Sequence, residues 1–292
     1  MPLWSTALIS RSLGLLCAQI EFSVSRWVYF APIGHHFYNR KIRYNIFMKK
    51  ILIIQSRTRP EMLTAEQGEY TRAIGALAEP VFISSLDESQ DWQHPEKILE
   101  GFSAVIFGGS GEFDFDGGRP QDDVARATSQ QIVARVRALV LHILQTDFPM
   151  MGICYGHQIV AEALGVPVVN DLEQKKTGTY EVALTPVGKA DKLFCDMPER
   201  FVAQFGHKDS LSRLPDGATL LVNSPNCKTS ALRYGSRVYT TQFHPELTAE
   251  DVAWKLKNSP GYLPEGVDVS SIVKPSLEAS TLIPKFIERV VV

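Results

Sequence analysis

The chain has 292 residues, of which 45% are hydrophobic and 21% charged, and its formal net charge is -2. This balance is typical of a globular protein and excludes a disordered chain or one dominated by membrane-spanning segments. A near-neutral charge without a basic stripe gives no electrostatic footprint for nucleic acid. We therefore expect neither a nucleic-acid partner nor a membrane partner.

The cysteines Cys17, Cys154, Cys195 and Cys227 are widely spaced and form no Cys-x-x-Cys pair. This spacing disfavours a zinc site or a disulfide framework and favours reduced thiols in a cytosol-like compartment. The sequence therefore predicts a cytoplasmic protein without a metal or another cofactor.

The first 47 residues differ from the rest of the chain. Arginine and lysine outnumber the single acidic residue, Glu21, and the longest apolar run, residues 13–20, is too short to span a bilayer. Two interpretations stay open, an organelle transit peptide or a translated leader ahead of a start at Met48. We favour the leader or another non-native extension, because Met48 and two lysines run straight into a strand-like apolar segment. Residues 1–47 are then outside the folded domain, 48–292.

From Met48 onward, short apolar runs alternate with longer amphipathic segments. We predict strands at residues 51–55, 80–83, 104–107 and 148–153, and helices at residues 66–78, 123–146 and 157–164. Strands that alternate with helices form βαβ units, and these give a mostly parallel sheet with helices on both faces.

After about residue 178 the pattern changes to strands joined by short turns, which predicts antiparallel or mixed pairing. We place these strands at residues 180–184, 201–205, 219–222, 230–233 and 238–243. Several prolines indicate a loop or a lid at residues 258–275, and residues 281–291 are expected to form a closing helix. The predicted fold class is α/β, with a mostly parallel central sheet and a smaller mixed or antiparallel sheet.

The strongest functional signal is the segment Gly152-Ile153-Cys154-Tyr155-Gly156-His157-Gln158, between a predicted strand and a predicted helix. Gly-x-nucleophile-x-Gly at such a turn is a nucleophile elbow, here with cysteine in place of serine. The turn tolerates little side chain at its two glycines and sets the sulfur at a helix N-terminus, where the thiolate is favoured over the thiol. A structural cysteine buried at a strand end would not explain the glycine pair. Cys154 is therefore predicted to be a nucleophile.

A second signal, Gln242-Phe243-His244-Pro245-Glu246, lies at the end of a predicted strand. A cysteine hydrolase needs an imidazole to take and return a proton, and a third group to hold its tautomer. His-x-Glu alone is a weak signal, but about 90 residues after a cysteine elbow it becomes specific. The predicted catalytic triad is Cys154, His244 and Glu246.

The third signal, Gly108-Gly109-Ser110-Gly111, directly follows the strand predicted at residues 104–107. The backbone N–H of Gly109 could form one half of an oxyanion hole and that of Tyr155 the other half. A phosphate-binding loop is the alternative, but no Gly-x-Gly-x-x-Gly or Walker pattern is present. The residues Glu112, Asp114 and Asp116 follow, and for them we favour a solvated, turn-capping role over a metal site.

These motifs, in this order, resemble those of the class I (triad) glutamine amidotransferases, and within them the glutaminase domain of GMP synthetase and its free-standing relatives. The resemblance covers about residues 49–250 and includes Phe205-Gly206-His207-Lys208-Asp209. It implies the flavodoxin-like fold of that family. It also implies a reaction in which the cysteine attacks the side-chain amide of glutamine, ammonia leaves, and water cleaves the glutamyl thioester.

By position, the resemblance further implies that Gln158 and the backbone around Lys208 and Asp209 hold the amino-acid end of the substrate. Two departures from the family pattern stand out. Ser110 replaces a proline that often follows the two glycines, so we expect a freer loop and weak glutamine hydrolysis without a partner. Lys208 replaces a glycine, and its cation could bind a carboxylate or alter which γ-glutamyl compound fits.

Three functions stay open on the sequence. The first is a glutamine amidohydrolase, acting alone or with a separate synthetase subunit, since no ATP-pyrophosphatase or Walker motif is present. The second is a hydrolase of γ-glutamyl peptides or conjugates, which needs the same triad and a roomier leaving-group pocket. The third, a catalytically silent regulatory protein, is disfavoured by the intact triad. We favour the first.

Overall fold

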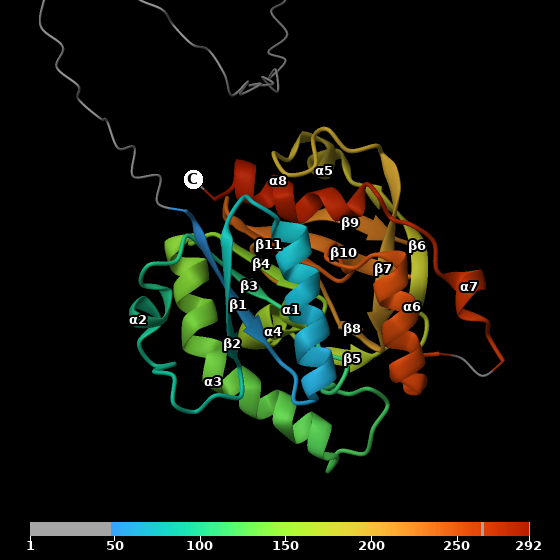
Figure 1. Ribbon diagram of the computed structural model, residues 1–292, viewed down its shortest axis with the longest axis horizontal. Coiled ribbons are helices and arrows are strands. Elements are labelled where there is room, and N and C mark those ends of the chain that lie inside the picture. The colour runs from blue at the N-terminus through green and yellow to red at the C-terminus, as the bar shows by residue number, and fades with distance from the viewer. Residues whose placement is uncertain (1–47, 264–265, 292) are drawn as a thin grey trace, which may run out of the picture. The chain divides into compact units, whose positions relative to one another are not determined.

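Nine strands form one central sheet in the computed structural model, which describes residues 48–263 and 266–291 (Figure 1). Their order is β2-β1-β3-β4-β11-β10-β9-β6-β7. The neighbours from β2 to β11 pair in parallel, and those from β11 to β7 pair antiparallel. The leader expected at residues 1–47 lies outside the described residues.

The parallel half of the sheet is largely buried, except at its edge strand β2, whose residues are exposed or half-buried. It consists of β1 (Lys50–Gln55), β2 (Glu79–Ser84), β3 (Ala104–Phe107), β4 (Met150–Ile153) and β11 (Val238–Thr241). Every residue of β3, β4 and β11 is buried. Strands buried on both faces favour apolar side chains throughout, which explains why β3 appears in the sequence as a continuous apolar run.

Helices cover the two faces of this half. Along β1, Ile51 and Ile53 belong to the core cluster that includes α1 (Pro60–Ile74) and α8 (Leu282–Arg289). The alternate residues, Leu52 and Ile54, belong to the cluster that includes α2 (Pro95–Leu99), α3 (Val124–Thr146) and α4 (Tyr155–Ala163). Successive side chains of a strand point to opposite faces, so one apolar strand contributes to both cores.

The antiparallel half extends the same sheet. It consists of β6 (Lys176–Leu184), β7 (Arg200–His207), β9 (Ala218–Ser224) and β10 (Cys227–Tyr234), with α5 (Pro186–Ala190) between β6 and β7. A separate two-stranded antiparallel sheet pairs β5 (Val168–Asn170) with β8 (Asp209–Leu211). The expected fold class is confirmed.

Several helices differ from the expectation, and the short helices α2 and α5 were not expected. Helix α1 begins at Pro60 rather than at residue 66, because proline at the first helical position lacks only an N–H that would have no partner there. Helix α6 (Ala249–Asn258) was not expected, although Thr248 and Asp251 form a capping box at its start. The loop expected at residues 258–275 contains the short elements η1 (Pro260–Tyr262) and α7 (Val269–Ile272), and η2 (Ala279–Thr281) precedes α8.

The topology brings the three sequence motifs to one edge of the sheet. Strands β3, β4 and β11 are adjacent and parallel, so their carboxyl ends meet. The loop at residues 108–111 follows β3, Cys154 follows β4, and His244 lies shortly after β11. In open α/β sheets, this edge is where ligands bind.

Candidate active site

Cys154 lies on the strained turn between β4 and α4. Its backbone has φ 51° and ψ -99°, a conformation that costs a residue with a side chain roughly 1–3 kcal/mol. A Cβ on Gly156 would lie 2.3 Å from the carbonyl oxygen of Phe107, and one on Gly152 would lie 2.9 Å from the carbonyl oxygen of Gly156. Only glycine fits at either position, and the turn therefore has the geometry of a nucleophile elbow.

His244 and Glu246 form a buried pair next to the elbow. The distance from His244 Nδ1 to Glu246 Oε1 is 2.6 Å, and the two residues are only 7% and 4% exposed. Burial alone lowers the pKa of His244, but the negative charges of Glu246 and Cys154, together with hydrogen bonds to both, raise it to about 10. The imidazole is then protonated at neutral pH and can stabilise a thiolate at Cys154.

Gln242 links the nucleophile to the residues around it. Its Nε2 lies 3.6 Å from Cys154 Sγ, and its Oε1 accepts a hydrogen bond from Gln158 Nε2 at 3.3 Å. The structure therefore brings Cys154, His244 and Gln158 into one cluster with Gln242, to which the sequence reasoning gave no role of its own.

The two proposed oxyanion donors border this cluster. A Cβ on Gly109 would lie 2.9 Å from His244 Cε1, so the loop after β3 packs directly against the imidazole. Tyr155 begins α4, and its amide follows the nucleophile. Within the described chain, neither backbone N–H donates a hydrogen bond to a protein acceptor. Both N–H groups therefore remain available to a ligand.

The glycine-rich loop and the residues after it are connected by side-chain hydrogen bonds. The Ser110 hydroxyl accepts hydrogen bonds from the N–H groups of Glu112 and Phe113, each at 3.2 Å. The Glu112 carboxylate in turn accepts one from the N–H of Thr58 at 2.8 Å. The expectation that serine leaves this loop freer than proline stays a prediction.

The acidic residues of the loop also differ from the expectation of a solvated stretch. Asp114 is 6% exposed, and its Oδ2 pairs with Arg119 Nε at 2.6 Å and with Lys208 Nζ at 3.1 Å. Asp116 does cap a turn, since its Oδ1 accepts a hydrogen bond from the N–H of Gly118. The interpretation of Asp114 as a solvated residue was therefore wrong, because its burial depends on packing and on Lys208, which is 94 residues away in the sequence.

The residues expected at the amino-acid end of the substrate come from α4 and the start of β8. Gln158 Nε2 donates to the backbone oxygen of Asp209 at 2.9 Å as well as to Gln242, which leaves its Oε1 as the group that can accept from a ligand. The Asp209 carboxylate accepts hydrogen bonds from the N–H groups of residues 115–117 and so anchors the loop. The Lys208 ammonium lies 4.6 Å from the ring centroid of Tyr262. Their role in substrate binding stays a prediction.

Two further histidines near the site are neutral. Burial lowers the pKa of His207 to about 4 and that of His157 to about 3. His207 Nδ1 donates to the backbone oxygen of Asp209 at 2.9 Å, and His157 Nδ1 lies 2.8 Å from Thr240 Oγ1. Both side chains are hydrogen bonded within the protein, so His244 is the histidine suited to proton transfer.

Arg57, a residue that the sequence reasoning missed, also reaches the site. It follows β1, is 7% exposed, and pairs through Nε with Glu66 Oε1 at 3.1 Å. Burial lowers the pKa of Arg57, but the carboxylates of Glu66 and Glu69 outweigh this effect and raise it above the ordinary value. The sequence offered one signal, a charged residue two positions after a buried strand, since the other site residues also lie near strand ends at this edge.

Neither a metal cluster nor a membrane span is found in the described ranges. No group of three or more histidine, cysteine, aspartate or glutamate side chains there could hold a metal ion. No helix in these ranges is both long and apolar enough to cross a membrane.

Residues 120–254, which include the three residues of the predicted triad, match the family described as glutamine amidotransferase class-I. The chain therefore contains a class I glutamine amidotransferase domain, as its motifs predict.

Its relatives include archaeal proteins that are named as one subunit of GMP synthase (glutamine-hydrolyzing). The protein from Methanocaldococcus jannaschii is 32% identical over 105 residues, which are 36% of this chain and 54% of the relative. The protein from Archaeoglobus fulgidus is 32% identical over 108 residues, 37% of this chain and 57% of the relative. The matched segment thus spans about half the length of these relatives.

Solved structures share the fold. A glutamine amidotransferase from Thermotoga maritima has a TM-score of 0.62 at 19% identity and covers 84% of this chain and 98% of its own. One from Methylobacillus flagellatus has a TM-score of 0.55 at 18% identity and covers 82% and 92%.

Proposed function

We propose that this chain is a cysteine-dependent amidohydrolase that cleaves γ-glutamyl C–N bonds, with glutamine as the parent substrate. The observation that carries this proposal is the cluster of Cys154 on a strained elbow, His244 paired with Glu246 at 2.6 Å, and two unused backbone donors at Gly109 and Tyr155. A nucleophile, a base with a fixed tautomer and an oxyanion hole are the parts that acyl transfer requires.

In the first step, the Cys154 thiolate attacks the γ-carbonyl carbon of the substrate. Negative charge develops on the carbonyl oxygen, where the N–H groups of Gly109 and Tyr155 would stabilise it. His244 donates a proton to the leaving nitrogen, the C–N bond breaks, and ammonia departs from glutamine. The glutamyl group remains on the sulfur as a thioester.

In the second step, His244 accepts a proton from water, which attacks the thioester carbon. The C–S bond breaks, glutamate leaves, and the thiolate is restored with the imidazolium beside it. Glu246 holds the proton on His244 Nδ1 throughout, so that the other ring nitrogen faces the reaction. At the amino-acid end, the free Oε1 of Gln158 is suited to accept from the substrate ammonium.

Two versions of this function differ in what happens to the leaving nitrogen. The relatives are named as parts of a GMP synthase, which favours ammonia delivery to a separate synthetase chain. The alternative is hydrolysis of γ-glutamyl peptides or conjugates without a partner. The hydrogen bonds of the loop after β3 support this alternative, because an ordered loop would present the proposed oxyanion donor at Gly109 without a partner chain.

The proposal is tested by replacing the nucleophile. Glutamate release from glutamine and from a γ-glutamyl dipeptide is measured for the wild type, for Cys154→Ala and for the control Cys195→Ala. We expect Cys154→Ala to lose activity by a factor of about 10³ or more, and the control to keep it. Activity above about 1% in Cys154→Ala would exclude the covalent mechanism.

A further inference from the structure

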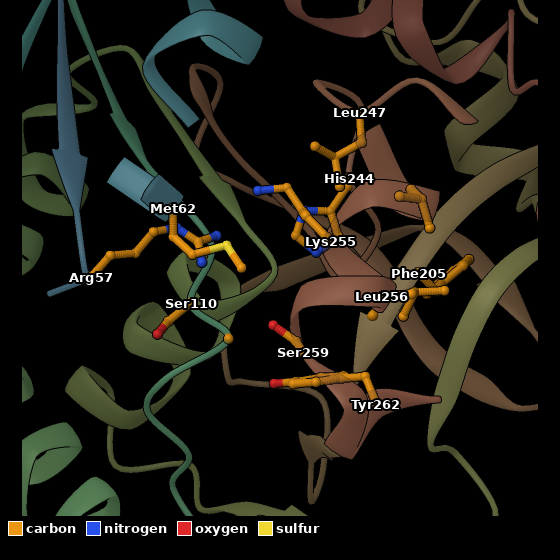
Figure 2. A pocket seen from close by; sticks show the side chains of 13 residues that line it. Arg57, Met62, Ser110, Phe205, His244, Leu247, Lys255, Leu256, Ser259 and Tyr262 are labelled. Atoms are coloured by element: carbon orange, nitrogen blue, oxygen red, sulfur yellow. The ribbon is translucent and has the colours of Figure 1, made fainter. Parts of the chain in front are cut away.

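A small cavity opens beside the catalytic histidine. Its walls come from the segment after β1, helix α1, the loop after β3, the end of β7, the segment after β11, and helix α6 with the turn that follows it. His244 lies on its wall (Figure 2), and apolar side chains make up much of the rest. These apolar residues include Met62, Leu247, Val252, Leu256 and Tyr262.

The lining residues place this cavity on the leaving-group side of the reaction. Ser110 and Gly111 of the oxyanion loop line it together with His244, but Gln158 and Asp209 do not. Those two residues lie toward the expected amino-acid end of the substrate. The leaving nitrogen must lie at His244, which protonates it, so a group attached to that nitrogen extends into this cavity.

Arg57 gives the cavity an anion-binding group. Its Nε forms an ion pair with Glu66, whereas neither Nη donates a hydrogen bond to another residue that the structure describes. A Cβ on Gly109 would lie 3.6 Å from Nη2, and one on Gly111 would lie 3.8 Å from Nη1, so the free edge of the guanidinium borders the oxyanion loop. Two parallel N–H groups of this kind match the two oxygens of a carboxylate.

The size of the cavity limits what it can hold. The space open to the centre of a water molecule is about 60 Å³. One water molecule takes roughly 10–15 Å³ by this measure, so the cavity holds roughly four to six non-hydrogen atoms. Ammonia would leave most of this space empty, whereas a small amino acid would fill it.

We propose that this cavity is a leaving-group subsite for a small apolar α-amino acid, whose carboxylate binds the free edge of Arg57 and whose side chain packs against Leu256 and its apolar neighbours. This inference rests on the proposed function and names the substrate class as γ-glutamyl dipeptides such as γ-glutamylalanine. The C–N bond to alanine breaks, the alanine nitrogen takes the His244 proton, and water then releases glutamate from the sulfur. Glutamate and alanine are the products, and one water molecule is consumed.

The first test uses the wild-type chain and three substrates: glutamine, γ-glutamylalanine and γ-glutamylalaninamide. The amide has the same shape as the dipeptide but lacks the carboxylate charge. We expect kcat/KM for γ-glutamylalanine to exceed the values for glutamine and for the amide by about tenfold or more, since a hydrogen bond to a charged group contributes that much.

The second test changes the subsite. Arg57→Gln should abolish the preference for γ-glutamylalanine over its amide, and Leu256→Phe should lower the ratio of dipeptide to glutamine hydrolysis because the ring fills the cavity. Arg213→Gln, at an exposed arginine that does not line the cavity, is the control and should leave both ratios unchanged. If Arg57→Gln fails to fold because Glu66 loses its partner, Leu256→Phe and the comparison of the three substrates with the wild type still test the subsite.

The outcomes separate this inference from the function on which it rests. Glutamate release that favours glutamine over γ-glutamylalanine would overturn the subsite and leave the amidohydrolase in place. Equal rates on γ-glutamylalanine and its amide would overturn the role of Arg57. If none of the three substrates gives glutamate release that depends on Cys154, both the proposed function and the subsite are overturned.

Discussion

Replacing Glu246 with glutamine keeps the size of the side chain and removes the charge beside His244. The pKa of His244 is raised from 6.5 to about 10, and the charges of Glu246 and Cys154 are the largest causes that raise it. At about 1.4 kcal/mol per unit, this shift corresponds to roughly 5 kcal/mol. If Glu246 supplies about half, its loss destabilises the imidazolium by roughly 2–3 kcal/mol, and kcat/KM should fall roughly 10²-fold.

The assay is the pH profile of kcat/KM for glutamate release. Acylation needs the His244 proton for the leaving nitrogen, so the wild type should lose activity only as the pH rises toward the pKa of His244. In Glu246→Gln this alkaline limb should move to lower pH, because a neutral partner no longer holds the proton. The matched control is Glu199→Gln, at an exposed glutamate that pairs with Lys189. A variant with nearly full activity and an unmoved alkaline limb would refute the assignment of Glu246 to the triad.

Further predictions concern stability and the loops around the site. Because the pKa of His244 is raised on folding, the protonated imidazole contributes fully to stability below about pH 6.5, and this contribution is lost as the pH rises through about 10. The free energy of unfolding in urea should therefore fall less over this pH range in His244→Ala than in the wild type. Gly156→Ala should lower the free energy of unfolding by about 1–3 kcal/mol, since the new Cβ meets the Phe107 carbonyl oxygen, whereas Gly68→Ala, with open space around it, should not. Asp209→Asn should weaken the hydrogen bonds to the N–H groups of residues 115–117, which lowers the melting temperature and kcat by measurable amounts if the loop positions the oxyanion hole.

The parts of the fold that follow from local pattern were predicted well. Continuous apolar runs predicted β3, and the amphipathic segment at residues 123–146 predicted α3, because burial on one or both faces imposes a period on the sequence. The start of α1 was missed because Pro60 was not interpreted as a first helical residue. The continuation of the parallel sheet into antiparallel strands depends on which strands pair, and pairing is decided by contacts between distant segments.

The residues of the candidate site also fall into two groups, those that local sequence could predict and those that it could not. Cys154, His244 and Glu246 could be predicted because their chemistry requires fixed local spacing around a sharp turn. Arg57 and Asp114 could not, because each is defined by a partner far along the chain or in another element: Glu66 on α1 for the arginine, and Lys208 for the aspartate. The sequence shows that such residues are charged, but only the folded chain shows that they are buried together.

The covalent intermediate tests the central claim most directly. The wild type is mixed with γ-glutamylalanine or glutamine, quenched in acid during turnover, and examined by intact mass and peptide mapping. We expect a glutamyl thioester on Cys154 that is absent from Cys154→Ala. Steady turnover without any adduct, or an adduct that maps to Cys195 or Cys227, would contradict the proposed mechanism.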